Sequence, residues 1–177
     1  NWGHYVETIG EQAFTGTQII KIAFPESIKS IGGSAFINNN ILKTLVFNEG
    51  LETIGAGAFA NNINLKDIEF PSKLVSVGDS AFYNCAEIRE VNLKYIETIG
   101  QSVFASCRRL TTVKVLEGAE SVGVTMFAAC PALSNIEFAS TVKDIGNGAF
   151  MNCTALKSVT FPDSLVRLGL KAFSGCS

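Results

Sequence analysis

The sequence contains few of the residues that catalytic and metal sites require. Only one of its 177 residues is a histidine, His4, and it stands near the start of the chain. A histidine-based triad along the rest of the chain is therefore excluded. Five cysteines cannot all pair within one chain, and none lies in a C-x-x-C arrangement, which argues against a zinc ribbon. We expect no catalytic residues, no metal site and no cofactor.

The chain also lacks an excess of either charge and a long apolar run. Fourteen basic and sixteen acidic residues give a net charge of -2, which disfavours a nucleic-acid partner. No apolar run approaches the roughly 20 residues of a membrane helix. The N-terminal sequence NWGHYVET has neither the basic nor the apolar region of a signal peptide. With 47% hydrophobic residues, the chain is expected to fold around a substantial core.

What the sequence does contain is a repeat of 22 or 23 residues. An apolar residue followed by glycine recurs eight times, and a phenylalanine stands four residues after each glycine. The glycines are Gly10, Gly32, Gly55, Gly78, Gly100, Gly123, Gly146 and Gly169, and the phenylalanines are Phe14, Phe36, Phe59, Phe82, Phe104, Phe127, Phe150 and Phe173. We therefore predict one repeat domain over 1–177, with a partial unit at about 5–17 and seven repeats over 18–177.

Each repeat is roughly L-x-x-V-x-F-P-x-x-L-x-x-I-G-x-x-A-F-x-x-C. The V-x-F alternation predicts a short strand with one buried face. The L-x-x-I-G segment predicts a turn, whose glycine supplies either a positive φ or room for a neighbouring backbone. The x-x-A-F-x-x-C segment has the spacing of one helical turn. Stacked copies would bury a continuous core and pair their strands in parallel at about 4.8 Å, giving a rod on the order of 35 Å long.

Two units depart from the pattern. The sequence EVNLKYIETIG is one residue short between Leu93 and Ile99, and VKVLEGAESVG places Ala119 in a column of larger residues. We expect these coils to be irregular. Because open solenoid ends expose core, we also expect either a fragment of a longer array or an N-terminal cap made of Trp2, His4 and Tyr5.

With these columns aligned, the chain resembles the BspA-like, TpLRR-type family of leucine-rich repeats. The units LKSVTFPDSLVRLGLKAFSGC and LKDIEFPSKLVSVGDSAFYNC carry the resemblance, which extends from about Tyr5 to Cys176. It implies a right-handed, curved leucine-rich-repeat solenoid with short parallel strands on one face and turns or short helical turns on the other. It also implies a surface or secreted protein of host-associated bacteria or parasitic protists that takes part in adhesion.

The cysteines and the Gly-x-Gly pairs have structural explanations. The five cysteines share one column, in which earlier units have Thr17, Asn39 and Asn62. We expect small inward side chains that bond to a neighbouring coil, as free thiols; disulfides and metal ligation are the disfavoured alternatives. Gly57 and Gly148 stand where other units have polar residues, and we attribute them to chance rather than to a phosphate-binding loop.

The outward strand positions are the candidate interaction surface. There a basic row lies beside an acidic cluster, and the alternatives are a solvated, salt-bridged face or a shallow patch for a protein or glycan. The candidate residues are Lys43, Lys66, Asp67, Glu69, Arg89, Glu90, Asn92, Lys114 and Glu137.

From these observations we expect a non-catalytic interaction module. Solenoids bind partners over an extended surface, and the outward positions vary where the inward ones repeat. The resemblance points to an extracellular or cell-surface monomer, without membrane insertion in this segment, that binds a host matrix or cell-surface protein or another microbial surface protein. The alternative is a rigid spacer that presents another domain of a longer surface protein.

Overall fold

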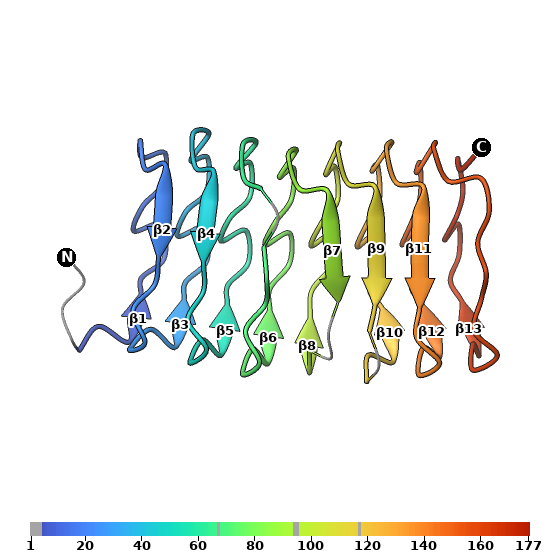
Figure 1. The fold of residues 1–177 in the computed structure, drawn as a ribbon, viewed down its shortest axis with the longest axis horizontal. Helices are drawn as coiled ribbons and strands as arrows, with labels where there is room; N and C mark the ends of the chain where they lie inside the picture. The colour runs from blue at the N-terminus through green and yellow to red at the C-terminus, as the bar shows by residue number, and fades with distance from the viewer. Residues whose placement is uncertain (1–4, 67, 94–95, 117) are drawn as a thin grey trace.

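The computed structural model describes residues 5–66, 68–93, 96–116 and 118–177. These residues form a parallel β-solenoid of about seven turns, drawn as a rod in Figure 1. The predicted repeat solenoid is confirmed. Each coil is one repeat, and every strand pairing in the described residues is parallel.

One row of strands comes from the V-x-F segments, and we call it the long-strand sheet. Its inward residues are more buried than the outward residues that alternate with them, as the alternation predicts. It consists of a β2–β4 pair and a β7–β9–β11 group. The strands are β2 (Lys21–Ala23), β4 (Thr44–Val46), β7 (Glu90–Leu93), β9 (Thr112–Val115) and β11 (Asn135–Phe138).

A second row, the short-strand sheet, was not predicted. The I-G step does more than turn the chain, because in most coils the two residues before the glycine pair in parallel with those of the next coil. This sheet has a five-stranded and a three-stranded part, which are separated between β8 and β10. Its strands are β1 (Thr8–Ile9), β3 (Ser30–Ile31), β5 (Thr53–Ile54), β6 (Ser76–Val77), β8 (Thr98–Ile99), β10 (Ser121–Val122), β12 (Asp144–Ile145) and β13 (Arg167–Leu168). This separation lies between the two units for which the sequence predicts irregular coils.

The glycine column provides space rather than a special backbone angle. A Cβ on Gly55 would lie 2.5 Å from the nitrogen of Gly33 in the coil before it. The positive φ instead falls two residues later, at 62° for Gly57 and 60° for Gly148. The explanation of these two glycines by chance is therefore wrong, because the same column is left-handed in the other units too, at polar residues such as Ser34.

The A-F segment forms consecutive turns, and the described residues contain no helix. A second left-handed position follows each phenylalanine by two residues, as at Asn38 with φ 62°. In these turns the backbone N–H groups bond alternately within the coil and to the next coil, as Ile37 does to Ser34 (3.1 Å) and Phe36 to Ala58 (2.7 Å). Bonds between coils thus replace the i to i−4 bonds that the helical spacing suggested.

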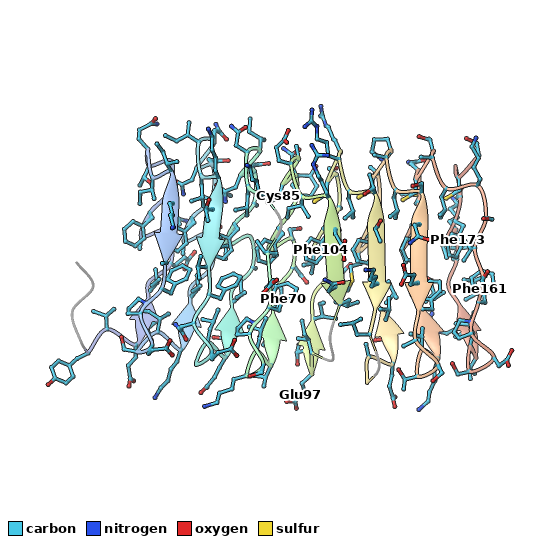
Figure 2. The ribbon with its side chains drawn as sticks, in the orientation of Figure 1. Phe70, Cys85, Glu97, Phe104, Phe161 and Phe173 are labelled. Atoms are coloured by element: carbon cyan, nitrogen blue, oxygen red, sulfur yellow. The ribbon has the colours of Figure 1, made fainter. Side chains whose placement is uncertain are left out.

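The core is a single cluster organised around stacked phenylalanines. Neighbouring rings of the A-F column lie 4.9–5.7 Å apart and within 14° of parallel from Phe14 to Phe173. The rings from Phe36 to Phe150 are fully buried. Figure 2 shows Phe104 inside the rod. Such pairs contribute about 0.5–1.5 kcal/mol each beyond their burial, so the column ties the coils together.

The N-terminal cap was one of two expectations for this end of the chain, and of its residues the structure describes Tyr5. The Tyr5 side chain is 94% exposed, which does not support its part in a cap. Trp2 and His4 lie outside the described residues.

Candidate interaction surface

The long-strand sheet sets the candidate residues side by side in the predicted columns. β7, β9 and β11 pair so that Asn92, Lys114 and Glu137 occupy one outward row. On the other part of the sheet, Ala23 of β2 is opposite Val46 of β4 in the same row. The register therefore confirms the alignment of the outward columns, while the binding role of these residues stays a prediction.

Lys114 is the centre of a charged network on this sheet. Its Nζ lies 3.1 Å from Oε1 of Glu90, and both side chains are partly exposed. The hydrogen bond to Glu90, then the charges of Glu90 and Glu137, raise the pKa of Lys114, so its ammonium group is held in the charged form. Asn135 donates to Oε1 of Glu137 at 3.0 Å. The expected ion pairing of the sheet is present here, with alternating charge across three strands.

Glu69 lies between two hollows at the interruption of the long-strand sheet. The first has a volume of about 350 Å³ and includes Val46 and Pro71 in its wall. The second has a volume of about 260 Å³ and includes Asn92 and Leu116. Glu69 and Phe70 belong to both walls, so this carboxylate stands on a ridge between two concave, partly apolar areas.

The remaining candidates form a more scattered set. Lys43, Lys66 and Arg89 are exposed. The Lys66 N–H bonds to the Lys43 carbonyl at 3.2 Å, which places these two residues on adjacent coils. Asp67 lies outside the described residues. Sequence reasoning missed Val46 and Leu116, which are 47% and 36% exposed. Val46 lies in the same outward column as the polar candidate residues, and this position in the repeat is the sequence signal that identifies it.

The cysteine column holds coils together. Each thiol donates to the carbonyl of the phenylalanine 25 or 26 residues earlier, as Cys85 does to Phe59 (3.2 Å) and Cys153 to Phe127 (3.2 Å). In an earlier unit Asn62 plays this part and reaches the carbonyls of both Phe36 (3.0 Å) and Phe59 (2.7 Å). The predicted inward bonding is confirmed, and all five cysteines are free thiols.

Burial keeps these thiols protonated. Desolvation raises the pKa of Cys85 and of Cys153 to about 12, against an ordinary value of 9.0. It raises the pKa of Cys107 and Cys130 as well. Among the described residues, no three histidine, cysteine or acidic side chains gather closely enough to hold a metal ion. Cys85, Cys107, Cys130 and Cys153 are thus held in the unreactive protonated form at neutral pH, whereas Cys176 is only partly buried.

The family follows from the pattern of these columns. A family model described as the BspA type leucine-rich repeat region, with six copies, matches residues 7–133 and 120–177. The chain belongs to this BspA-type leucine-rich repeat family. Leucine-rich repeats of this kind are generally non-catalytic modules that bind other proteins. No curated protein matches the sequence. No helix within the described residues has the length and apolar character needed to cross a membrane.

Several solved structures have a similar fold. A leucine-rich repeat protein of T. pallidum, TpLRR, is 26% identical with a TM-score of 0.79, and the match covers 86% of this chain and 72% of that one. A leucine-rich repeat protein of Eubacterium ventriosum is 20% identical with a TM-score of 0.60, covering 89% and 59%. The pneumococcal vaccine antigen PcpA is 19% identical with a TM-score of 0.54, covering 93% and 56%. The chain spans less than two thirds of the latter two.

Proposed function

We propose that this BspA-type chain is an adhesin-like module, exposed at a cell surface or secreted, that binds a partner protein through its long-strand sheet. The observation that carries the proposal is the charged network around Lys114 next to the hollows at Glu69. One similar protein is named a vaccine antigen, which supports an exposed location. The partner is a host matrix or cell-surface protein or another microbial surface protein.

The surface fits a protein better than a small substrate. Its hollows are shallow areas beside the strands, and their walls combine apolar side chains such as Val46 and Leu116 with Glu69. Apolar centres with a polar rim are typical of protein interfaces. Within the described residues this sheet has concave areas that are open to solvent, and such areas do little to separate the pKa values of two carboxylates, as acid–base catalysis requires. We therefore infer no enzymatic activity, and we expect a monomer that engages one partner along the rod.

Replacement of Glu69, Arg89 and Glu90 together tests this surface. The variant Glu69→Gln/Arg89→Gln/Glu90→Gln should bind the partner more weakly by about 0.6–3 kcal/mol, a loss of roughly 3- to 150-fold, because each of the three surface charges contributes about 0.2–1 kcal/mol. The partner is first isolated by a pull-down with the wild-type array against matrix and surface proteins. The dissociation constants of the purified pair are then compared.

A matched variant on the short-strand side is the control. Glu7→Gln/Lys29→Gln/Glu52→Gln also removes two acids and one base, including an exposed ion pair of 3.3 Å between Lys29 and Glu7. It should leave binding unchanged. Equal losses in both triple variants would point to non-specific electrostatics and contradict the proposed surface.

The alternative function is a rigid spacer. The unbroken phenylalanine stack from Phe14 to Phe173 favours it, because a continuous core resists bending. In that case the Glu69→Gln/Arg89→Gln/Glu90→Gln variant binds as the wild type does, and the rod serves to hold another domain away from the cell.

A further inference from the structure

The short-strand sheet is open between two consecutive coils. β8 pairs with β6 and β10 pairs with β12, but within the described ranges no pairing joins β8 to β10. Figure 1 shows a wider interval here than between the other neighbouring strands of this sheet. The same coils stay joined elsewhere, because β7 pairs with β9 and the Ser102 N–H bonds to the Val124 carbonyl at 3.1 Å. The opening is confined to one face of the rod.

The two edges of the opening are complementary. Where the sheet is closed, each glycine N–H bonds to a carbonyl of the preceding coil, as Gly146 does to Val122 at 2.8 Å. No such bond joins the Gly123 N–H to the Ile99 carbonyl, both of which are described. Because the N–H and C=O of one residue point to the same side of a parallel strand, β8 presents those of Ile99 to the opening, and β10 presents those of Ser121 together with the Gly123 N–H. A parallel strand inserted between β8 and β10 would form backbone hydrogen bonds to these groups on both of its sides.

Two irregularities of the sequence produce the opening. The unit that contains β8 is one residue short between Leu93 and Ile99. In the next unit Ala119 stands in the column where the adjacent coils have Ile96 and Val142. The smaller side chain removes contacts that would hold β10 against β8, because deleted methyl groups leave space that the surroundings fill only in part.

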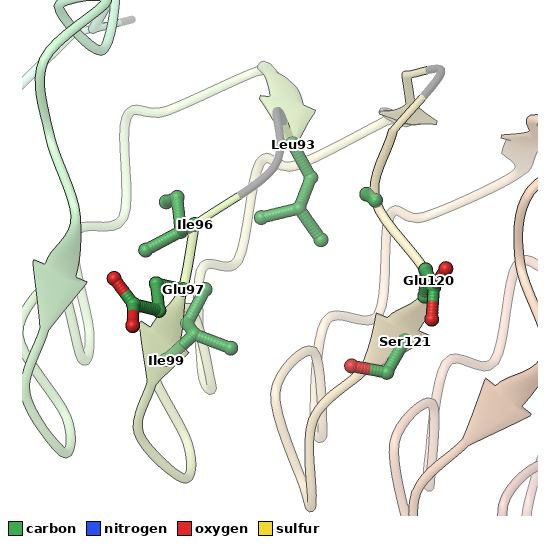
Figure 3. Close-up of a pocket in the computed structure, with 7 residues that line it drawn as sticks. Leu93, Ile96, Glu97, Ile99, Glu120 and Ser121 are labelled. Carbon is green, nitrogen blue, oxygen red and sulfur yellow. The ribbon is translucent and has the colours of Figure 1, made fainter.

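A pocket of about 120 Å³ occupies the opening. Its lining residues, drawn in Figure 3, are Leu93, Ile96, Glu97, Ile99, Ala119, Glu120 and Ser121. Leu93 and Ile99 point into the space, and Ser121 lies across from them. An engineered apolar cavity of about 150 Å³ accepts benzene, so this pocket has room for one aliphatic side chain.

The polar part of the pocket is acidic. Glu97 and Glu120 hold the same column position on the two coils and both line the pocket, so this column of the opening carries two carboxylates. Figure 2 shows Glu97 at the edge of the rod. In closed parts of the sheet this column forms ion pairs, as between Lys143 Nζ and Glu120 Oε1 at 2.9 Å. A lysine or arginine is the complementary residue for that position.

We propose that the opening between β8 and β10 is a strand-insertion site for an extended segment of a partner protein. The segment carries an aliphatic residue that faces inward and a lysine or arginine two residues before it. It runs parallel to β8 and β10, accepts from Ser121 and Gly123, and donates to Glu97 and Ile99. This face is separate from the long-strand sheet, so the inference goes beyond the function proposed above and does not depend on it.

A blocked peptide with the sequence of residues 27–34, SIKSIGGS, is the probe. This sequence already forms β3 of the same sheet, with Lys29 in the column of Glu97 and Ile31 in the column of Ile99. Titration calorimetry should show saturable binding to the whole chain. Hydrogen exchange of the Ser121 and Gly123 amides should be fast in the free protein and slow in the complex. A peptide with its lysine changed to glutamate and its second isoleucine to aspartate should not bind.

Variants of the chain separate the site from general stickiness. Ala119→Leu fills the pocket with a side chain of the size that is usual in this column. It should weaken binding of the probe peptide by more than about 10-fold. Glu97→Gln and Glu120→Gln should each weaken it by about 2- to 5-fold. Glu52→Gln, in the same column where the sheet is closed, should have no effect. The Glu69→Gln/Arg89→Gln/Glu90→Gln variant should also bind the probe normally, which keeps the two proposals distinct.

Three results would overturn the inference. The first is slow exchange of Ser121 and Gly123 in the free protein, as slow as at Gly146, because it would mean that the sheet is closed. The second is probe binding that survives in an Ala119→Leu variant with wild-type circular dichroism. The third is dimerisation of the chain that Ala119→Leu abolishes, because it would assign the opening to a second copy rather than to a partner protein.

Discussion

The cysteine column gives single residues a measurable effect on stability. The Cys85 thiol has no exposed surface and donates to the Phe59 carbonyl, so its thiolate would be buried without a cation. Unfolding returns this thiol to water, where it ionises near its ordinary pKa of 9.0 rather than about 12. Between these pH values the unfolded chain loses a proton that the folded chain keeps. The stability from Cys85 is complete below pH 9 and is lost as the pH rises towards 12.

We predict that the free energy of unfolding of the Cys85→Ala variant falls less steeply with rising pH, above about pH 9, than that of the wild type. A buried thiol of this kind lowers the free energy of unfolding by about 1.4 kcal/mol per pH unit within that window. Urea unfolding from pH 8 to 11 measures the slope for the wild type and the variant. Cys176→Ala is the control, because Cys176 is only partly buried and should change the slope less. Identical slopes for the wild type and Cys85→Ala, or rapid alkylation of native Cys85 at pH 8, would contradict the prediction.

At the scale of one coil, the spacing between neighbours depends on the glycine column. A methyl group on Gly55 would press against backbone atoms of the preceding coil, which side-chain rotation cannot relieve. Gly10 has the same place in the first described unit, and a Cβ there meets nothing within 4 Å. The two positions therefore differ in their neighbours and share their local sequence pattern.

We predict that Gly55→Ala destabilises the protein by about 3 kcal/mol, because overpacking typically costs about 1–3 kcal/mol and the neighbours here are rigid backbone atoms. Gly10→Ala should be neutral or stabilise by up to about 1 kcal/mol, because alanine reduces the entropy of the unfolded chain. Thermal and urea unfolding of both variants provide the comparison. A similar loss in both would mean that backbone conformation, not contact between coils, selects this glycine.

The columns of the repeat could be predicted from the sequence, but some local geometry could not. The registers that align Asn92 with Lys114 and Ile31 with Ile54 are those that the repeat predicts. For the A-F segment the sequence left turns and short helical turns open, because helical spacing is also compatible with successive turns, and bonds to the next coil decide for the turns. The hollows beside Glu69 were not predictable, because they arise where the strand row is interrupted rather than from any residue type.

At the scale of the whole rod, the two sheets are interrupted at different places. Among the described strands, the long-strand sheet is broken between β4 and β7, and the short-strand sheet between β8 and β10. Each interruption is bridged by the other sheet or by the phenylalanine stack, so the rod remains one body. In a solenoid each coil contacts only its neighbours, and stability is roughly a sum of coil and interface contributions. Within the described residues, the interface between the coils of β8 and β10 lacks the backbone hydrogen bonds that join short strands elsewhere. At this interface the stability of one coil should therefore depend least on its neighbour.

This weak interface predicts that destabilisation stays largely on its own side. Phe59→Leu and Phe150→Leu remove equivalent, fully buried rings of one stack on opposite sides of the opening, each at a cost of about 1–3 kcal/mol. With Phe59→Leu, hydrogen exchange should accelerate more at Gly55 and Gly78 than at Gly146 and Gly169. With Phe150→Leu the order should reverse. Ala119→Leu, which restores packing across the opening, should make either effect spread further. Equal acceleration along the whole rod in both single variants would show that the phenylalanine stack alone makes the solenoid cooperative, and that the opening has no mechanical consequence.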